Sequence, residues 1–154
     1  MRLRAITYQF VLPLVPIVEG TVIILATHFW FDVPLLGSLV LLYLGLLLFI
    51  AAVTGIGLMI SSLAATQQQA LLGAFLFMVP SIILSGFATP IANMPRTVQY
   101  ITWLDPLRYF LIVLRGSFLE GAGASLFWPQ YWPLAVIGVV SMIVAGRLFR
   151  SRLF

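Results

Sequence analysis

The fold is decided by residues 35–63, which read LLGSLVLLYLGLLLFIAAVTGIGLMISSL. This stretch has no charged residue, and the uncharged region extends on both sides, from Asp32 to Arg96. A helix of about 20 apolar residues crosses the hydrocarbon core of a bilayer, so the stretch predicts a membrane-spanning helix. Of all 154 residues, 62% are hydrophobic and 8% are charged, against about 25% charged in a soluble domain. A chain of this length cannot bury so much apolar surface in water, and we predict an integral membrane protein.

Working outward from this stretch, the sequence predicts four membrane spans in a single domain that covers residues 1–154. Turn-forming or polar residues separate the spans at Asp32-Val33-Pro34 and again between Ser61 and Gln69. The first apolar run ends in aromatic residues rather than in a signal-peptide cleavage site, so we expect it to be retained. The expected fold class is all-α, a polytopic membrane helix bundle of about four transmembrane helices. The spans are expected at about 10–31, 35–63, 70–87 and 131–148.

The segment between the third and fourth spans is too polar for two further spans and too apolar for a solvated loop. It predicts two short helices, at 97–104 and 107–119, separated by Asp105-Pro106. Asp caps free helix amides and Pro suits the first helical position, so this dipeptide should start the second helix. Helices this short cannot cross about 30 Å of hydrocarbon at about 1.5 Å per residue. We therefore expect an extracytoplasmic re-entrant helical hairpin at about 95–120.

The basic residues indicate the orientation of the chain. All eight are arginines, and five of them lie near the two ends of the chain, at positions 2, 4, 147, 150 and 152. Cytoplasmic segments of membrane proteins are enriched in Lys and Arg, so we predict that the N- and C-termini are both cytoplasmic, which requires an even number of crossings. The arginines form no basic stripe interleaved with aromatic residues, and no nucleic-acid partner is expected despite the net charge of +4.

The side chains of common enzyme sites are missing from the sequence. There is no lysine, and therefore no phosphate-binding Walker loop, and no cysteine to ligate a metal as a thiolate. His28 is the one histidine, and no Ser–His–acid set is recognisable. We expect no catalytic residue, no metal site and no cofactor bound by this chain.

Several blocks of sequence resemble the type-2 permease family of ABC exporters. They are GIGLMISS at 55–62, ATQQQA at 65–70, LSGFATPIANMP at 84–95, PLRYF at 106–110 and LRGSFLEG at 114–121. The blocks occur in order and at plausible spacing, and the resemblance extends over most of the chain. An ordered set of this kind is far more specific than any one block.

The resemblance implies a transmembrane permease subunit of an ATP-driven exporter in the cell (inner) membrane. It implies six spans per permease, a re-entrant hairpin before the last span, and a dimer with a second permease copy or homologue. A separate cytoplasmic ABC ATPase subunit would bind ATP and Mg, and membrane lipid would surround the spans. Family members have two more spans and a large extracytoplasmic domain before this region, so we expect the C-terminal portion of a permease. The coupling helix that docks on the ATPase would precede the first span, with residues 1–9 as its remnant.

Two candidate sites lie outside the hairpin, and each has a structural alternative. Gln67, Gln68 and Gln69 form an expected ATPase-facing loop, or they simply separate two helices. Glu19 lies inside the first span, where an ionisable residue costs about 3 kcal/mol or more and suggests a functional polar site. Alternatively, its carboxyl is hydrogen-bonded to a neighbouring helix or stays wet near the interface.

The remaining candidates shape or gate the hairpin: Gly86, Pro90, Asn93, Pro95, Asp105, Pro106, Arg115 and Gly116. Arg115 either complements the end of a short helix or acts in a gate. Arg108 and Arg115 are expected to lie at polar depth or to pair with Asp105 and Glu120. The glycines of the second span, at positions 45, 55 and 57, are interpreted as positions where helices approach closely.

Two other function classes stay open at this stage. One alternative is a small non-transporting membrane protein that acts as a scaffold or assembly factor. The other is an intramembrane enzyme, which the scarcity of catalytic side chains disfavours. The sequence does not specify a transported substrate, because apolar pathway walls suit drugs, lipids and polymers alike.

Overall fold

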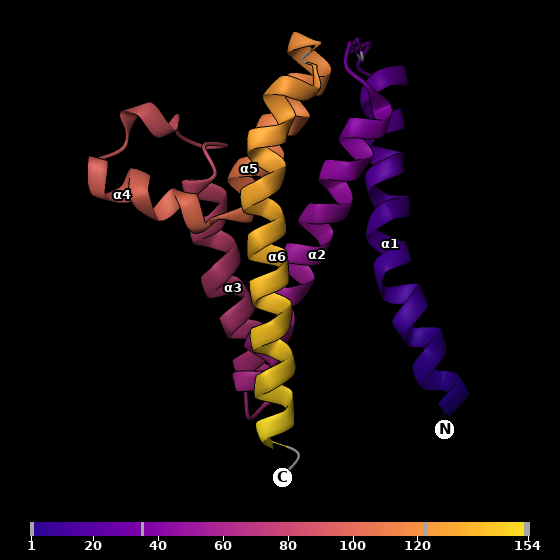
Figure 1. Ribbon diagram of the computed structural model, residues 1–154, viewed down its shortest axis with the longest axis vertical. Coiled ribbons are helices and arrows are strands. Elements are labelled where there is room, and N and C mark those ends of the chain that lie inside the picture. Colours follow the sequence, from indigo (N-terminus) through magenta and orange to yellow (C-terminus); the bar gives the residue numbers. More distant parts are fainter. Residues whose placement is uncertain (1, 35, 122, 153–154) are drawn as a thin grey trace.

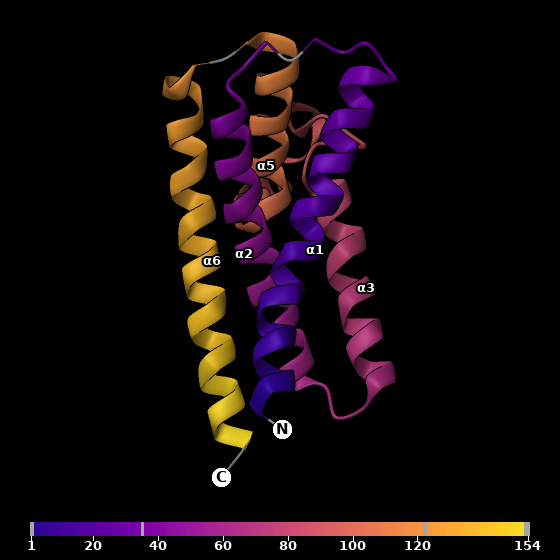
Figure 2. The same cartoon turned by 90° about the vertical axis from the view of Figure 1, so that its right-hand side faces the viewer.

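The computed structural model describes residues 2–34, 36–121 and 123–152, and these residues are helical with no strand. The all-α fold class is therefore confirmed. Four long helices run along the long axis of the molecule, and two short helices lie between the third and the last (Figures 1 and 2). The α-helices are α1 (Arg2–Phe29), α2 (Leu39–Leu63), α3 (Gln67–Leu84), α4 (Arg96–Ile101), α5 (Pro106–Arg115) and α6 (Ala124–Arg152). Shorter turns are η1 (Ile91–Asn93), η2 (Thr102–Leu104) and the π-helical η3 (Gly116–Glu120).

Three of the four predicted spans coincide with helices that are long and apolar enough to cross a membrane, namely α2, α3 and α6 over Ala124–Leu148. The first predicted span lies in α1, of which Leu14–Phe29 forms a shorter apolar helix among the described side chains. The last helix begins earlier than the predicted span and runs through Pro129 and Pro133 instead of starting beside them. Both prolines lie beyond the first turn of α6, where each removes an intrahelical hydrogen bond, and membrane helices tolerate such prolines when neighbouring groups satisfy the freed carbonyls.

Helices α2 and α6 form the centre of the bundle, where small residues bring their backbones together. A Cβ on Gly55 would collide with the Ser141 hydroxyl, and a Cβ on Gly138 would lie 3.5 Å from the Ala52 nitrogen. Close approach of this kind is how helices associate in lipid, where burial of apolar surface gives little driving force. Gly57 differs from the prediction, because a Cβ there would meet nothing within 4 Å.

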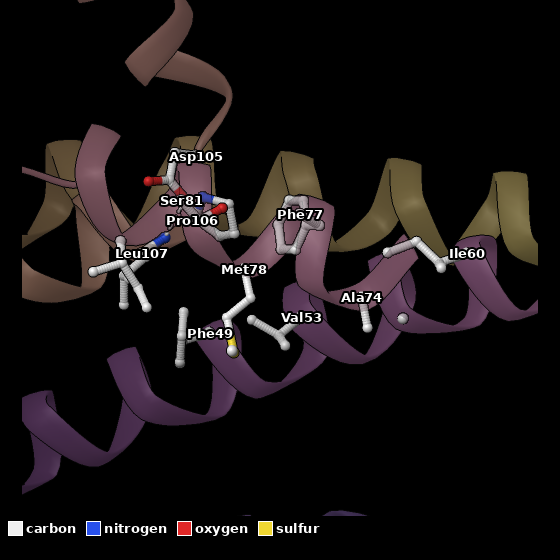
Figure 3. A pocket seen from close by; sticks show the side chains of 12 residues that line it. Phe49, Val53, Ile60, Ala74, Phe77, Met78, Ser81, Asp105, Pro106 and Leu107 are labelled. Atoms are coloured by element: carbon white, nitrogen blue, oxygen red, sulfur yellow. Dashed lines mark hydrogen bonds between the residues drawn. The ribbon is translucent and has the colours of Figure 1, made fainter. Parts of the chain in front are cut away.

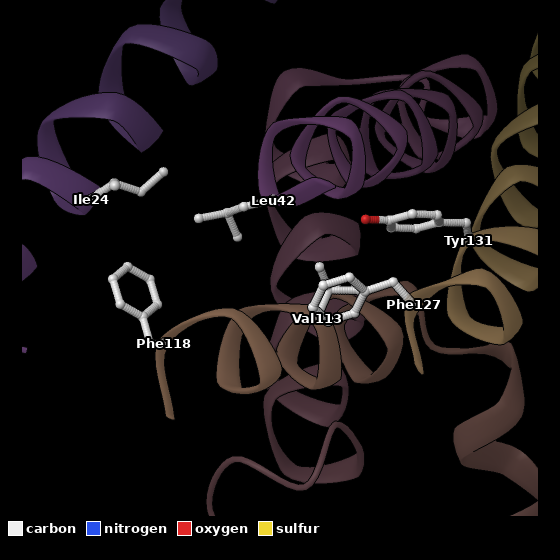
Figure 4. Packing of buried hydrophobic residues seen from close by; sticks show 6 residues of the cluster. All are labelled: Ile24, Leu42, Val113, Phe118, Phe127 and Tyr131. Carbon is white, nitrogen blue, oxygen red and sulfur yellow. The ribbon is translucent and has the colours of Figure 1, made fainter. Parts of the chain in front are cut away.

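One cluster of buried hydrophobic side chains joins this central pair to the other elements (Figure 4). Its members come from α1, α2, α5, η3 and α6: Ile24, Leu42, Val113, Phe118, Phe127 and Tyr131. Leu42, Val113 and Phe127 are fully buried, and the Tyr131 hydroxyl donates a hydrogen bond to the Leu41 carbonyl. By contrast, most side chains of α3 are exposed and apolar, as suits a helix that faces lipid.

The described part of α1 packs on the bundle at a limited contact. The Tyr43 hydroxyl of α2 donates to the Thr21 hydroxyl at 2.9 Å. One residue earlier, a Cβ on Gly20 would lie 2.8 Å from a methyl group of Leu46. The lower half of α1 diverges from its neighbours in Figure 1, so these contacts fix the register of α1 on α2.

The turns of the bundle alternate between its two ends. Helices α1 and α6 have their outer ends at the lower end of Figures 1 and 2, where the α2–α3 turn also lies. At the upper end, the loop between α1 and α2 contacts the end of the hairpin, because the Gly37 amide donates to the Ser117 carbonyl at 2.8 Å. This alternation agrees with four crossings and with both termini on one side.

The segment between α3 and α6 has the shape expected of the hairpin. The predicted short helices correspond to α4 with η2 and to α5 with η3, and the break falls at Asp105, as predicted. In Figure 1 these elements occupy the upper half of the molecule, and the chain returns to the upper end without reaching the lower one. The depth of the hairpin in a membrane stays a prediction.

Candidate functional site

The hairpin turns at Asp105, where the side chain caps α5. Its Oδ1 accepts a hydrogen bond from the Leu107 amide at 3.2 Å, and Pro106 occupies the first helical position. Pro has no amide that would need a partner there, and its fixed φ suits the start of a helix. The predicted capping role of Asp105 is therefore confirmed.

The carboxyl of Asp105 is also buried, with 5% of the residue exposed. Its second oxygen, Oδ2, has no hydrogen-bond partner among the described residues. Burial raises the pKa of Asp105 to about 6, while the Leu107 amide, the nearby Ser81 hydroxyl and Arg108 oppose the rise. An unpaired buried carboxylate oxygen is energetically costly, so this turn carries a polar group that the fold leaves incompletely satisfied.

Asp105 closes one end of a cavity of about 340 Å³ between α2, α3 and the start of α5 (Figure 3). The walls are apolar and include Phe49 of α2 and Phe77 and Met78 of α3. Asp105 and Ser81 are the polar side chains among the residues that line the cavity. Gly57 also lines the cavity, so it faces this space and not a neighbouring helix.

Arg108 does not pair with Asp105, in contrast to one predicted alternative. Its guanidinium donates to the Thr102 hydroxyl and lies 5.6 Å from the centre of the Trp103 ring and 5.9 Å from that of Tyr109. A guanidinium at this distance from an aromatic face is attracted to it. The aromatic rings and Thr102 thus hold Arg108 within the hairpin.

Arg115 connects the end of α5 to the end of α3. It donates to the Gly86 carbonyl at 3.2 Å, and Gly86 has φ +84°, a conformation that favours glycine. The predicted pairing of Arg115 with Glu120 is not found, and the described residues form no salt bridge.

The other hairpin candidates lie at the ends of short elements. Gly116 opens the π-helical turn, Pro90 precedes η1 and Pro95 precedes α4. Asn93 ends η1. The structure thus brings Gly86 and Arg115 together, and it places the other hairpin candidates in turns.

The glutamines at the lower end start α3. Thr66 caps the helix, because its hydroxyl accepts a hydrogen bond from the Gln69 amide at 3.2 Å. Oε1 of Gln69 accepts from the amide of Ala65, the residue before the cap, at 2.9 Å, so the side chains of Thr66 and Gln69 each satisfy one amide at the start of α3. Gln67 and Gln68 are exposed. Gln69 therefore has a structural role, and an ATPase contact of this turn stays a prediction.

Glu19 lies on α1 and is exposed. It borders a second cavity, formed by α1, α2 and α5. The candidate residues thus fall into three separate places: the hairpin with the end of α3, the lower turn, and α1.

A family model described as the ABC-2 type transporter matches residues 5–119. The match covers the first three long helices and the hairpin as far as η3. This chain belongs to the ABC-2 type transporter family.

Three curated relatives from Escherichia coli (strain K12) illustrate the similarity. The chain is 40% identical over 131 residues to the probable multidrug ABC transporter permease YbhR, covering 84% of this chain and 36% of YbhR. It is 33% identical over 135 residues to the inner membrane transport permease YhhJ, covering 88% of this chain and 36% of YhhJ. Over 101 residues it is 41% identical to the probable multidrug ABC transporter permease YbhS, covering 63% of this chain and 26% of YbhS. The chain thus spans about a third or less of the length of these relatives, and no solved structure matches it.

Sequence reasoning missed several residues of this ABC-2 chain. Ser81 lies beside Asp105 at the same end of the cavity, and its one sequence signal is a small polar residue directly after Pro80 in an apolar stretch. Phe49 and Phe110 stack with ring centres 4.6 Å apart, but neither differs in the sequence from the other aromatic residues of apolar helices. Such pairs depend on the angle between helices, which one sequence does not specify.

Proposed function

We propose that this chain is the membrane part of a permease subunit of an ATP-driven exporter, in the inner membrane. The family match over residues 5–119, together with a helix bundle that has the predicted alternation of turns, carries this proposal. The names of the relatives YbhR and YhhJ, a multidrug ABC transporter permease and an inner membrane transport permease, support it. Since the sequence has no lysine and hence no Walker loop, a separate ATPase would hydrolyse the ATP.

The lower end of the bundle is the proposed cytoplasmic side. Helix α1 begins at Arg2 and α6 ends at Arg152, both at this end. Five of the eight arginines belong to these two terminal segments, and the positive-inside rule places such segments in the cytoplasm. Reporter fusions after Gln69 and after Arg152 should report the cytoplasm, and fusions near Asp32 and Gly123 should report the outside. A cytoplasmic signal at Gly123 would contradict this orientation and the hairpin with it.

The α2–α3 turn is the proposed contact of the cytoplasmic ATPase subunit, with Gln67 and Gln68 among its exposed side chains. To test this, a photo-crosslinking amino acid is placed at Gln68 in a chain co-expressed with an ABC ATPase subunit. A covalent adduct with the ATPase is expected. The matched control carries the same amino acid at Gly123, at the opposite end of the bundle, and should give no adduct.

The same membranes test the proposed dimer of permease chains, in which a second copy or a homologue faces this one. The photo-crosslinking amino acid is placed at positions on the exposed side of α3, and adducts between two permease chains would support the dimer. If Gln68 gives no ATPase adduct and ATP causes no export from vesicles that contain both subunits, the permease proposal fails. A scaffold or assembly protein would then be the better description.

A further inference from the structure

The cavity beside Glu19 is separate from the hairpin cavity and has a volume of about 340 Å³. Helices α1, α2 and α5 surround it. Its lining is apolar apart from Glu19, and it includes Leu42, Leu46 and Leu114. The volume falls at the lower end of the range found for small-molecule pockets, about 300–1,000 Å³.

The contact between α1 and α2 holds Glu19 at the edge of this cavity. Gly20 lies against Leu46, and Thr21 accepts a hydrogen bond from Tyr43. These two residues directly follow Glu19, so the backbone of residue 19 has a defined position along α2. Glu19 precedes the last residue of α1 by ten positions, which corresponds to about 15 Å along the helix axis, or roughly half the thickness of the hydrocarbon core.

The charge of Glu19 has no counterpart within the described part of the chain. Its side chain makes no hydrogen bond and no ion pair there, and it is exposed. A charged group at mid-span costs about 3 kcal/mol or more when it faces lipid. A cation that occupies the cavity would reduce this cost, since the two charges would attract each other strongly at low dielectric constant.

The wall of the cavity opposite α1 contains an aromatic pair. Phe49 of α2 and Phe110 of α5 stack with ring centres 4.6 Å apart and an angle of 11° between the rings. Both residues line the cavity. The two rings add apolar area to the wall, which suits the apolar part of a ligand. The cavity therefore combines one carboxylate, aromatic rings and aliphatic walls.

We propose that this cavity binds a lipophilic organic cation, with Glu19 as the countercharge and the Phe49–Phe110 pair as part of the apolar surface. The proposal that this cavity binds the cation does not depend on the permease function. The further step, that the protein transports the cation, rests on the proposed permease function. An anion of the same shape would be repelled by Glu19, and a hydrophilic cation would gain nothing from the apolar walls.

Two probes of nearly the same size and opposite charge test the proposal. Binding of radiolabelled tetraphenylphosphonium, a cation, and tetraphenylborate, an anion, is measured on the purified chain in lipid nanodiscs, with empty nanodiscs as background. The wild-type chain should bind the cation above background and should not bind the anion. In the Glu19→Gln variant, affinity for the cation should fall by at least about tenfold, because the attraction between the two charges is lost.

The Glu120→Gln variant is the matched control, because it removes the same charge from an exposed residue of η3, outside the cavity. It should bind the cation like the wild type. A Phe110→Leu variant should weaken binding of the cation by a smaller factor, and thermal unfolding of each variant establishes that the chain is folded. Cation binding that is absent from the wild-type chain, or unchanged in a folded Glu19→Gln variant, overturns the proposal.

Transport experiments separate the two proposals. If Glu19-dependent binding is found but ATP drives no export, the cavity assignment holds and the permease function fails. If export of the cation is found but does not depend on Glu19, the permease function holds and the cavity assignment fails.

Discussion

Replacing Asp105 with Asn should stabilise this protein at neutral and alkaline pH. The carboxyl of Asp105 is buried, its Oδ1 caps α5, and its Oδ2 has no partner among the described residues. Asn keeps an oxygen that can accept from the Leu107 amide, so the cap is retained. It also removes a charge that burial disfavours and offers an NH₂ group close to the Ser81 hydroxyl.

The magnitude follows from the pKa of this carboxyl. Burial raises the pKa of Asp105 from 3.8 to about 6, and each pKa unit corresponds to about 1.36 kcal/mol, so ionisation destabilises the folded state by about 3 kcal/mol. Because the pKa is raised on folding, this penalty is fully present above about pH 6 and disappears as the pH falls toward 4. The difference in the free energy of unfolding between variant and wild type should follow the same course.

Thermal unfolding monitored by circular dichroism in mild detergent between pH 4 and pH 8 measures this difference. At pH 8 the Asp105→Asn variant should melt about 6–12 °C above the wild type, using about 2–4 °C per kcal/mol for a chain of this size. Near pH 4 the two proteins should melt at similar temperatures.

Asp32→Asn is the control, because it removes the same charge from an exposed position outside the hairpin. Asp32→Asn should not show the rise in melting temperature at high pH that is expected of Asp105→Asn. If Asp105→Asn melts at or below the wild-type temperature at pH 8, the carboxyl is not held ionised and unpaired in the folded protein, and the description of the hairpin turn is wrong.

Two further predictions concern packing and capping. Gly55→Ala should destabilise the fold by about 1–3 kcal/mol, because its Cβ would overlap the Ser141 hydroxyl. Gly57→Ala should be neutral or stabilising by up to about 1 kcal/mol, because its Cβ would have nothing within 4 Å. The melting temperatures of the two variants test this difference. Thr66→Ala should cost about 1 kcal/mol of stability, because the Gln69 amide loses its acceptor. Equal melting of this variant and the exposed-site control Gln68→Ala would contradict the capping role of Thr66.

The long helices could be predicted from the sequence because lipid imposes a simple requirement on it. Uninterrupted apolar stretches had to be helical, since no other open backbone satisfies its own hydrogen bonds in hydrocarbon. The break at Asp105-Pro106 could also be predicted, because a capping side chain followed by proline starts a helix through local interactions alone. The start of α6 could not be predicted, because Pro129 and Pro133 normally indicate a helix boundary, and their tolerance inside a helix depends on neighbouring groups that satisfy the freed carbonyls.

The partners of the candidate residues could not be predicted from one sequence. Charge pairing suggested Asp105 and Glu120 for the two hairpin arginines, but Arg108 bonds to Thr102 and Arg115 bonds to the Gly86 carbonyl. The choice depends on the angle at which α5 leaves the turn and on the conformation of Gly86. Similarly, Gly57 has the same sequence context as Gly55 but faces a cavity, because two positions differ by about 200° around a helix.

Two hydrogen bonds that join the hairpin to the rest of the bundle use main-chain oxygens. Arg115 bonds to a carbonyl of residue 86, and the amide of Gly37 bonds to a carbonyl of residue 117. Every amino acid supplies that carbonyl, so replacement of the side chain at 117 does not call for a compensating change at 37. In addition, a Cβ at position 37 would lie 2.9 Å from the Cα of Ser117, and a position restricted to one residue type cannot vary in step with another. An alignment of homologues would therefore show little coevolution between these pairs, although they help to position the hairpin.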